Sequence, residues 1–163
     1  YGLSKRLYSR YMMDFSADFT SYHFILPNMF SEDDLKPGTR LVPYTLQYLQ
    51  DYNAGKNVQV PSFSAGLQTR QFITLEEMIQ TVDKAVCKYI VSDVYNMGGG
   101  EFLSIRHLIE RLFAIYNVPC KDEFFGQEIR RDGDIKSLRI DGSKLMNELG
   151  ALPNSKIEDI FKI

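Results

Sequence analysis

Short β-rich runs alternate with amphipathic helical patterns along the whole chain, and this alternation restricts the fold more than any other feature of the sequence. The clearest helix starts at Thr74-Leu-Glu-Glu77, which has the spacing of a capping box, and apolar residues then recur at helical intervals as far as Ile90. The run Tyr22–Leu26 is continuously apolar, which favours a strand of a parallel sheet buried on both faces. The sequence therefore predicts an α/β or α+β architecture.

The same criteria predict the remaining elements. We expect helices over residues 1–15, 41–49, 104–113 and 143–149, the last ended by Gly150, and a further capping box at Ser155–Glu158. We expect strands over residues 57–60, 69–73, 94–97 and 136–140, with loops at 31–34 and 37–38. The cluster Gly98-Gly-Gly100 then reads as a flexible turn between a strand and the helix capped by Ser104.

Composition excludes several classes of protein. The chain has 163 residues, of which 44% are hydrophobic and 25% charged, so it matches one globular domain and not a disordered, collagen-like or coiled-coil chain. Its 19 basic and 21 acidic residues nearly cancel, and we expect neither a nucleic acid nor a membrane as partner. No apolar run approaches about 18 residues, and no signal peptide is apparent. The two cysteines, Cys87 and Cys120, fit a reduced cytoplasmic protein.

One pair of residues has the spacing of an acid/base site. Tyr1 and Lys5 lie four positions apart in the first predicted helix, so their side chains share a face. A neighbouring ammonium lowers the pKa of a phenol from its usual value of about 10, which suits general acid/base chemistry. The same spacing also arises by chance, because Tyr52 and Lys56 repeat it at a helix end marked by Gly55, where the facing geometry is lost.

Several segments carry a resemblance to a known family when they are taken in order: Tyr1-Gly-Leu-Ser-Lys5 before a helix, a strand ending in Pro27-Asn28, Gln68–Ile73, Tyr95–Gly98, Arg130-Arg-Asp-Gly-Asp134, and Asp141–Lys144 through Leu149–Pro153. This order resembles the extended short-chain dehydrogenases/reductases, the NAD(P)-dependent nucleotide-sugar epimerase and dehydratase family. The resemblance spans the whole chain.

The resemblance implies a fold. We expect residues 1–163 to be the carboxyl-terminal half of such an enzyme: the carboxyl-terminal part of a Rossmann-like parallel sheet plus a small mixed α/β substrate-binding domain. The amino-terminal cofactor-binding part is expected to be absent, because a dinucleotide fold needs a glycine-rich turn after its first strand and the only glycine cluster, Gly98–Gly100, follows a late strand.

The resemblance also implies an activity. It indicates an enzyme that uses NAD or NADP to epimerise, dehydrate or reduce a nucleotide-diphosphate sugar. It assigns acid/base catalysis to Tyr1 and Lys5, cofactor contacts to Tyr1, Lys5 and Pro27, and substrate contacts to Asn28, Arg70, Arg131 and Asp134. The first helix is expected to mediate a homodimer, since its apolar residues exceed what the site needs.

Some residues depart from the family pattern. Gln71 stands where an acidic residue is usual, Glu77 where an aspartate is common, Ile25 where an arginine is frequent, and Phe30-Ser31 where Tyr-Gly is frequent. We expect no metal site, because His23, His107 and the cysteines lack metal-ligand spacing. The alternative hypothesis is a non-catalytic nucleotide-sugar-binding or scaffolding fragment.

Overall fold

The computed structural model describes residues 2–14, 19–128 and 135–161. Within these ranges the helices are α1 (Gly2–Asp14), α2 (Leu41–Asn53), α3 (Leu75–Cys87), α4 (Ile105–Ile115) and α5 (Ser143–Leu149), with single 3₁₀ turns η1 (Glu32–Leu35), η2 (Asp122–Phe124) and η3 (Ile157–Asp159). The strands are β1 (Tyr22–Ile25), β2 (Asn28–Phe30), β3 (Thr69–Thr74), β4 (Asp93–Asn96), β5 (Glu101–Ser104) and β6 (Ser137–Leu138). The predicted α/β character is confirmed.

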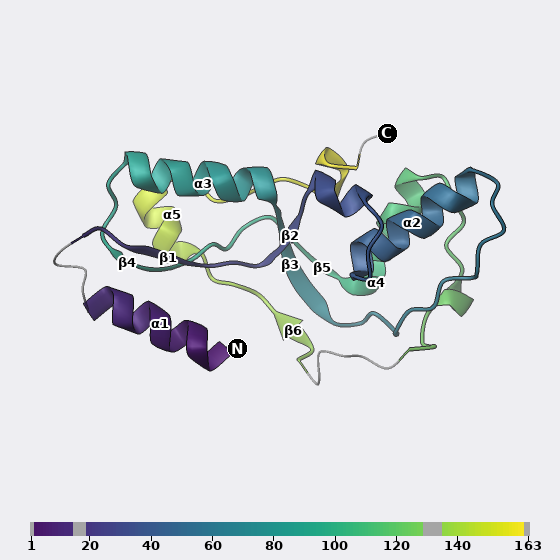
Figure 1. Cartoon of the computed structure of the whole chain (residues 1–163), viewed down its shortest axis with the longest axis horizontal. Helices are drawn as coiled ribbons and strands as arrows, with labels where there is room; N and C mark the ends of the chain where they lie inside the picture. Colours follow the sequence, from purple (N-terminus) through teal and green to yellow (C-terminus); the bar gives the residue numbers. More distant parts are fainter. Residues whose placement is uncertain (1, 15–18, 129–134, 162–163) are drawn as a thin grey trace.

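The strands form two sheets that share no strand. In the first sheet β1 pairs with β4 in parallel, and Tyr22 lies opposite Asp93. In the second sheet β3 pairs in parallel with β2 and β6 and antiparallel with β5. Figure 1 shows α3 and α5 on one side of β1 and β4 and α1 on the other, whereas α2 and α4 lie at the opposite end of the molecule. The fold is thus a parallel β/α part joined to a mixed α/β part.

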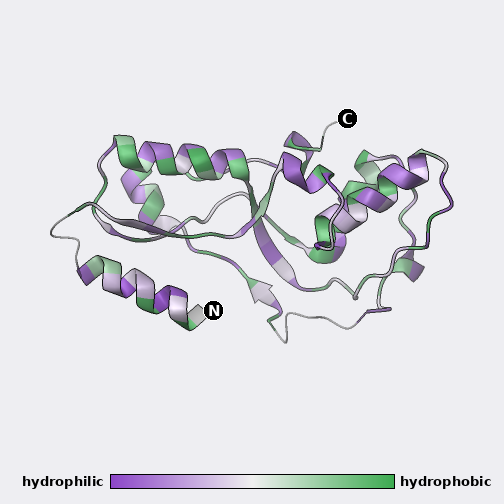
Figure 2. Cartoon of the chain, in the orientation of Figure 1, coloured by the Kyte–Doolittle hydropathy of each residue, from purple (hydrophilic) through white to green (hydrophobic). Residues whose placement is uncertain are grey.

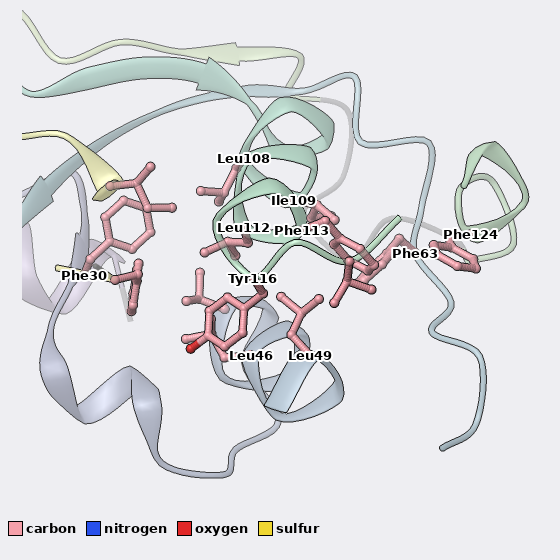
Figure 3. Close-up of a cluster of buried hydrophobic side chains, with 14 of the residues drawn as sticks. Phe30, Leu46, Leu49, Phe63, Leu108, Ile109, Leu112, Phe113, Tyr116 and Phe124 are labelled. Carbon is pink, nitrogen blue, oxygen red and sulfur yellow. The ribbon is translucent and has the colours of Figure 1, made fainter. Parts of the chain in front are cut away.

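The larger hydrophobic core lies in the part that contains α2 and α4. Leu46 and Leu49 of α2 face Leu108 and Leu112 of α4, and each of these side chains is fully buried (Figure 3). Burying a leucine contributes about 1.5–3 kcal/mol, so the contact between these two helices is a main source of stability for this part of the fold. The periodic apolar residues that predict both helices are the ones that form this contact.

A second core packs α3 and α5 against β4. Tyr95 and Leu145 are fully buried there, and Figure 2 shows apolar and polar residues interleaved along α3, as its amphipathic pattern predicts. The helix begins as expected, with Thr74 Oγ1 accepting from the backbone N–H of Glu77 at 3.1 Å. The carboxylate of Glu77 does not complete the capping box. It accepts instead from the backbone N–H of Ser155 at 2.7 Å, which ties the start of α3 to the carboxyl-terminal segment.

The glycine cluster allows close packing of the chain's own backbone. A Cβ on Gly98 would lie 2.5 Å from the carbonyl oxygen of Ile140, and one on Gly100 would lie 2.0 Å from that of Phe72. Gly100 also has a φ of 63°. This turn connects two strands, since β5 follows it directly. Its glycines face packed protein, and they leave no open cradle for a phosphate.

The structure differs from the predicted secondary structure in three respects. Residues 57–60 form no strand, because no backbone hydrogen bond joins them to another described segment, and Val60 is 59% exposed. Strands β2 and β5 were not predicted, and both exist through their pairing with β3. The predicted capping box at Ser155–Glu158 is shifted by one residue: Lys156 is the N-cap, and Asp159 Oδ2 accepts its backbone N–H at 2.8 Å.

Candidate functional site

A cavity of about 940 Å³ lies where β2 and β3 meet the amino-terminal end of α2. Residues 58–60 and 62–64, which precede β3, form a further part of its lining. Binding sites for small organic molecules have volumes of about 300–1,000 Å³. The cavity therefore has the size of a site for a ligand as large as a nucleotide.

Two arginines of the described residues, Arg40 and Arg70, line the cavity, and Arg70 is the buried one. It lies in β3 and is only 8% exposed. Its guanidinium donates to the carbonyl oxygens of Thr69 at 2.8 Å and Ile135 at 3.1 Å. These bonds fix the orientation of the side chain, because guanidinium donors lie in one plane. A buried and oriented guanidinium at a cavity wall is well suited to bind an anionic oxygen.

Asn28 lies beside Arg70 on the neighbouring strand. It is opposite Phe72 in the parallel register of β2 and β3, and Arg70 is two residues from Phe72. Side chains two residues apart along a strand point to the same face, so Asn28 and Arg70 both face the cavity, which both of them line. Asn28 Nδ2 donates to the carbonyl oxygen of Gln71 at 3.3 Å, and the side chain is otherwise exposed.

Aromatic side chains form much of the remaining wall. Phe30 and Phe72 stack with ring centres 4.8 Å apart, and Tyr44 meets Phe63 edge to face at 5.9 Å. Tyr48 also lines the cavity. Such surfaces favour a planar, partly apolar group such as a nucleobase. The cavity thus combines an anion-binding centre with an aromatic wall.

The acidic side chains that line the cavity are bonded within the protein. Asp34 accepts from Arg40 at 2.7 Å, and Glu128 accepts from the hydroxyl of Ser62 at 3.2 Å. Asp51 is held by Lys56 at 2.6 Å.

These contacts and burial set the charge of the wall near neutral pH. Hydrogen bonds from Lys56 and Gln47 lower the pKa of Asp51, so it is ionised. Burial, with Tyr52 nearby, raises the pKa of Tyr48, so this phenol is neutral and remains a hydrogen-bond donor.

Two of the residues predicted for catalysis and cofactor binding, Lys5 and Pro27, do not line this cavity. Lys5 is exposed on α1, and the half-buried Pro27 follows β1 directly, but neither lines the cavity. Helix α1 contacts β1 through the rings of Tyr8 and His23, whose centres are 6.4 Å apart. The structure thus brings together Asn28 and Arg70 and leaves Lys5 and Pro27 apart from them.

Three of the predicted site residues, Tyr1, Arg131 and Asp134, lie outside the described residues, as does Arg130. The proposed facing of Tyr1 and Lys5 across one helical turn therefore stays a prediction. The second pair with this spacing does not form an acid/base site: α2 ends at Asn53, and the ammonium of Lys56 bonds to Asp51.

Two buried glutamines flank Arg70 in the sequence, and neither was assigned a role from the sequence; Gln68 lines the cavity and Gln71 does not. Gln71 Nε2 donates to the carbonyl oxygen of Gly99 at 2.6 Å, while its Oε1 accepts from the backbone N–H of Ile140 at 2.8 Å. Gln68 lines the cavity and is 8% exposed. Its spacing of two residues from Arg70 in a predicted strand is the one sequence signal that could have identified Gln68 as a cavity residue.

The described residues include no cluster of three or more histidine, cysteine or acidic side chains able to hold a metal ion. His23 Nε2 lies 2.7 Å from the hydroxyl of Ser21, and His107 is exposed. Both cysteines are free, and burial raises the pKa of the Cys120 thiol to about 11. Among the helices described, none has the length and apolar character needed to cross a bilayer.

Comparison with known proteins gives one sequence relative and many similar folds. No family model matches the chain. Over 120 residues the chain is 22% identical to a dTDP-glucose 4,6-dehydratase of Streptomyces griseus, a match that covers 74% of this chain and 34% of the relative.

The structure superposes on the UDP-glucose 4-epimerase of Thermotoga maritima, solved with UDP-glucose, with a TM-score of 0.78 and 20% identity over 99% of this chain and 50% of that one. The structure also superposes on the UDP-glucose 4-epimerase of Bifidobacterium longum, solved with NAD⁺ and UDP. The TM-score is 0.75 and the identity 21%, over 99% of this chain and 52% of that one. The chain thus spans about half the length of these structures and about a third of the curated relative. In sequence and in fold, this chain is similar to the nucleotide-sugar epimerases and dehydratases of the extended short-chain dehydrogenase/reductase family.

Proposed function

We propose that this chain binds a nucleotide-diphosphate sugar in the cavity between β3 and α2, as part of an NAD(P)-dependent epimerase, dehydratase or reductase. The observation that carries the proposal is the buried Arg70 guanidinium, held in a fixed orientation at the wall of a cavity of about 940 Å³. The similarity to enzymes solved with UDP-glucose and UDP supports the same class of ligand.

Different residues bind different parts of the ligand. Arg70 and Asn28 hold the diphosphate, together with Arg131, which Asp134 orients. The aromatic wall that contains Tyr44 accommodates the nucleobase. Charge-assisted hydrogen bonds to phosphate are about twice as strong as neutral ones, so the diphosphate anchors the ligand while the sugar extends toward the reacting groups.

The cofactor we propose is NAD or NADP, which supplies hydride transfer when bound. Lys5 holds the hydroxyls of the nicotinamide ribose, and Pro27 contacts the nicotinamide end. The turn at Gly98–Gly100 does not fit the pyrophosphate of the cofactor, because it is filled by the chain's own backbone and offers no cradle. Tyr1, with its pKa lowered by Lys5, takes up or releases the proton of the sugar hydroxyl.

The binding proposal is tested by calorimetric titration of the chain with UDP-glucose and dTDP-glucose. We expect Arg70→Ala to lower the affinity about tenfold or more, since a charge-assisted hydrogen bond contributes about 1.5–3 kcal/mol. Arg139→Ala is the matched control, because Arg139 is exposed, stacks on Phe102 and does not line the cavity. Equal affinities for Arg70→Ala and the unchanged chain, or no binding of either ligand, would contradict the proposal.

We expect this chain by itself to be inactive, because the resemblance implies that the cofactor-binding part is not among its residues. The catalytic part is therefore tested in an enzyme that contains this chain together with a cofactor-binding part, by the nicotinamide absorbance during incubation with the cofactor and a sugar nucleotide. We expect Tyr1→Phe to lower turnover by about 100-fold or more and to leave sugar-nucleotide affinity unchanged. Arg70→Ala should mainly raise the Michaelis constant for the sugar nucleotide. Binding without turnover, whichever residue occupies position 1, would favour the alternative of a non-catalytic nucleotide-sugar-binding or scaffolding fragment.

A homodimer through α1 is also part of the proposal. Leu3, Leu7 and Tyr11 recur at intervals of four residues and are 71%, 58% and 60% exposed. This row forms an exposed apolar face, and its burial against a second copy of the chain would be favourable in free energy. Sedimentation should report a dimer at micromolar concentration, and Leu7→Lys should convert it to a monomer. A monomer before the substitution would refute this part of the proposal.

A further inference from the structure

A second guanidinium lines the cavity that contains Arg70. Arg40 is the N-cap residue of α2, and 71% of its side chain is exposed. Arg70 differs, because it is 8% exposed and donates to two backbone carbonyl oxygens. The part of the cavity wall at the start of α2 therefore presents a cation that a ligand can contact directly.

A buried carboxylate fixes the position of Arg40. The Nη2 group of Arg40 donates to Asp34 Oδ1 at 2.7 Å, and Asp34 Oδ2 accepts from the backbone N–H of Ser31 at 2.9 Å. Ser31 directly follows β2, so these two bonds tie the guanidinium to the end of that strand. The side chain of Asp34 is only 3% exposed. A ligand in the cavity can therefore reach the guanidinium, whereas protein covers almost all of the carboxylate.

The bond to Asp34 leaves most of the donors of Arg40 available. A guanidinium has five N–H groups in one plane, and this is the one side-chain hydrogen bond that Arg40 makes to the residues described. Because the side chain is already held in place, a ligand that binds it pays less entropy for ordering it. Such a guanidinium suits an anionic oxygen, which it binds through charge-assisted hydrogen bonds.

We propose that Arg40 binds an anionic oxygen of the ligand, as a second cation beside Arg70. This assignment rests on the function proposed above and deepens it. A nucleotide-diphosphate sugar offers anionic oxygen from two sources: the diphosphate, and a carboxylate where the sugar is a uronic acid. Two cations from different elements of one cavity wall match a ligand that has more than one anionic group.

The test compares Arg40→Gln with the unchanged chain by calorimetric titration with uridine, UMP, UDP, UDP-glucose and UDP-glucuronate. We expect the affinity for uridine to stay the same, because uridine has no anionic group. The affinity for the anionic ligands should fall about three- to tenfold, a loss limited by the solvent exposure of Arg40. A loss shared by UDP and UDP-glucose assigns Arg40 to the diphosphate. A loss confined to UDP-glucuronate assigns it to the carboxylate of the sugar.

A double variant separates binding from a structural effect. Arg40→Gln leaves the buried Asp34 without its cation, which by itself destabilises the fold. The double variant Asp34→Asn/Arg40→Gln removes both charges and keeps the net charge of the chain. It should regain part of the melting temperature that Arg40→Gln loses, while its affinity for the anionic ligand stays low.

Lys36→Gln is the matched control. Lys36 is an exposed cation next to η1, bonds to Asp33 at 2.6 Å and does not line the cavity. The substitution removes the same charge from the same part of the surface. All ligand affinities should therefore be unchanged in Lys36→Gln.

The outcomes separate this inference from the proposed function. If the unchanged chain binds none of the uridine nucleotides, the proposed function fails and the inference fails with it. If the chain binds them and Arg70→Ala weakens binding while Arg40→Gln does not, only the inference is overturned. The inference is also overturned if Arg40→Gln weakens uridine as much as the nucleotides, or if the double variant regains full affinity. Both of these results indicate a structural role for Arg40.

Discussion

Replacement of Gln71 by glutamate tests how the two halves of the fold are joined. Gln71 is 5% exposed and uses both ends of its amide: Nε2 donates to the carbonyl oxygen of Gly99, and Oε1 accepts from the N–H of Ile140. A neutral glutamic acid can repeat both bonds, with its hydroxyl as donor. An ionised glutamate cannot, because it has no donor and would face the carbonyl oxygen of Gly99.

The size of the effect follows from the cost of keeping this glutamate protonated. Its pKa in the folded protein should rise above the ordinary value of about 4.3. The variant therefore has the stability of the unchanged chain below about pH 4 and loses about 1.4 kcal/mol for each pH unit above that value. Since pH 7 lies about 2.7 units above the ordinary glutamate pKa of about 4.3, the loss of stability at pH 7 is at most about 3.7 kcal/mol. The loss stops growing once the pH exceeds the pKa of the glutamate in the folded protein.

The assay is urea unfolding followed by circular dichroism at several pH values between 4 and 8. Gln127→Glu is the control, because Gln127 is exposed and its variant should differ little from the unchanged chain. Gln71→Met removes both side-chain bonds and should cost about 2–4 kcal/mol at every pH. A loss in Gln71→Glu that does not change with pH, or no loss at pH 7, would refute the reasoning.

Two further predictions concern the backbone and an ion cluster. Gly100→Ala should cost about 3 kcal/mol or more, because its Cβ would lie 2.0 Å from the carbonyl oxygen of Phe72, whereas Gly55→Ala, which also has a positive φ but open space, should cost only about 1–2 kcal/mol in thermal unfolding. Arg111→Met removes the partner of Glu158 and should lower the free energy of unfolding at pH 7 by about 1–2 kcal/mol, a value reduced for the solvent exposure of Glu158. Equal losses of stability at pH 3 and pH 7 would contradict the assignment of this stability to the ion pair. Arg111 lowers the pKa of Glu158, so this stabilisation is present above the ordinary carboxyl pKa of about 4.3 and is lost as the pH falls through the folded value.

The sequence by itself determined the elements whose signals are local. The amphipathic stripes of α3 and α4, the caps at Thr74 and Ser104 and the left-handed residue Gly150 after α5 all depend on residues within about four positions of one another. The parallel pairing of β1 also followed from its apolar run. The predicted burial of this strand on both faces was wrong, because no residue of β1 is fully buried and Ile25 is 50% exposed. The order of several motifs indicated the family, because many weak local signals in a fixed order are more specific than any one of them.

Only the tertiary structure decided which distant segments meet. Strands β2 and β5 exist because β3 pairs with them, and no pattern within their few residues predicts that pairing. Glu77 caps the segment at Ser155, which is 78 residues away, and does not cap its own helix.

The candidate site also depends on contacts between distant segments that the sequence does not specify. Sequence resemblance selected Asn28 and Arg70, and the parallel register of β2 and β3 brings them to one face of one cavity. Neither Gln68 nor Gln71 was assigned a role, because an amide has a role only when its hydrogen-bond partners are known. Those partners come from loops and strands far along the chain, and the sequence alone does not specify their positions.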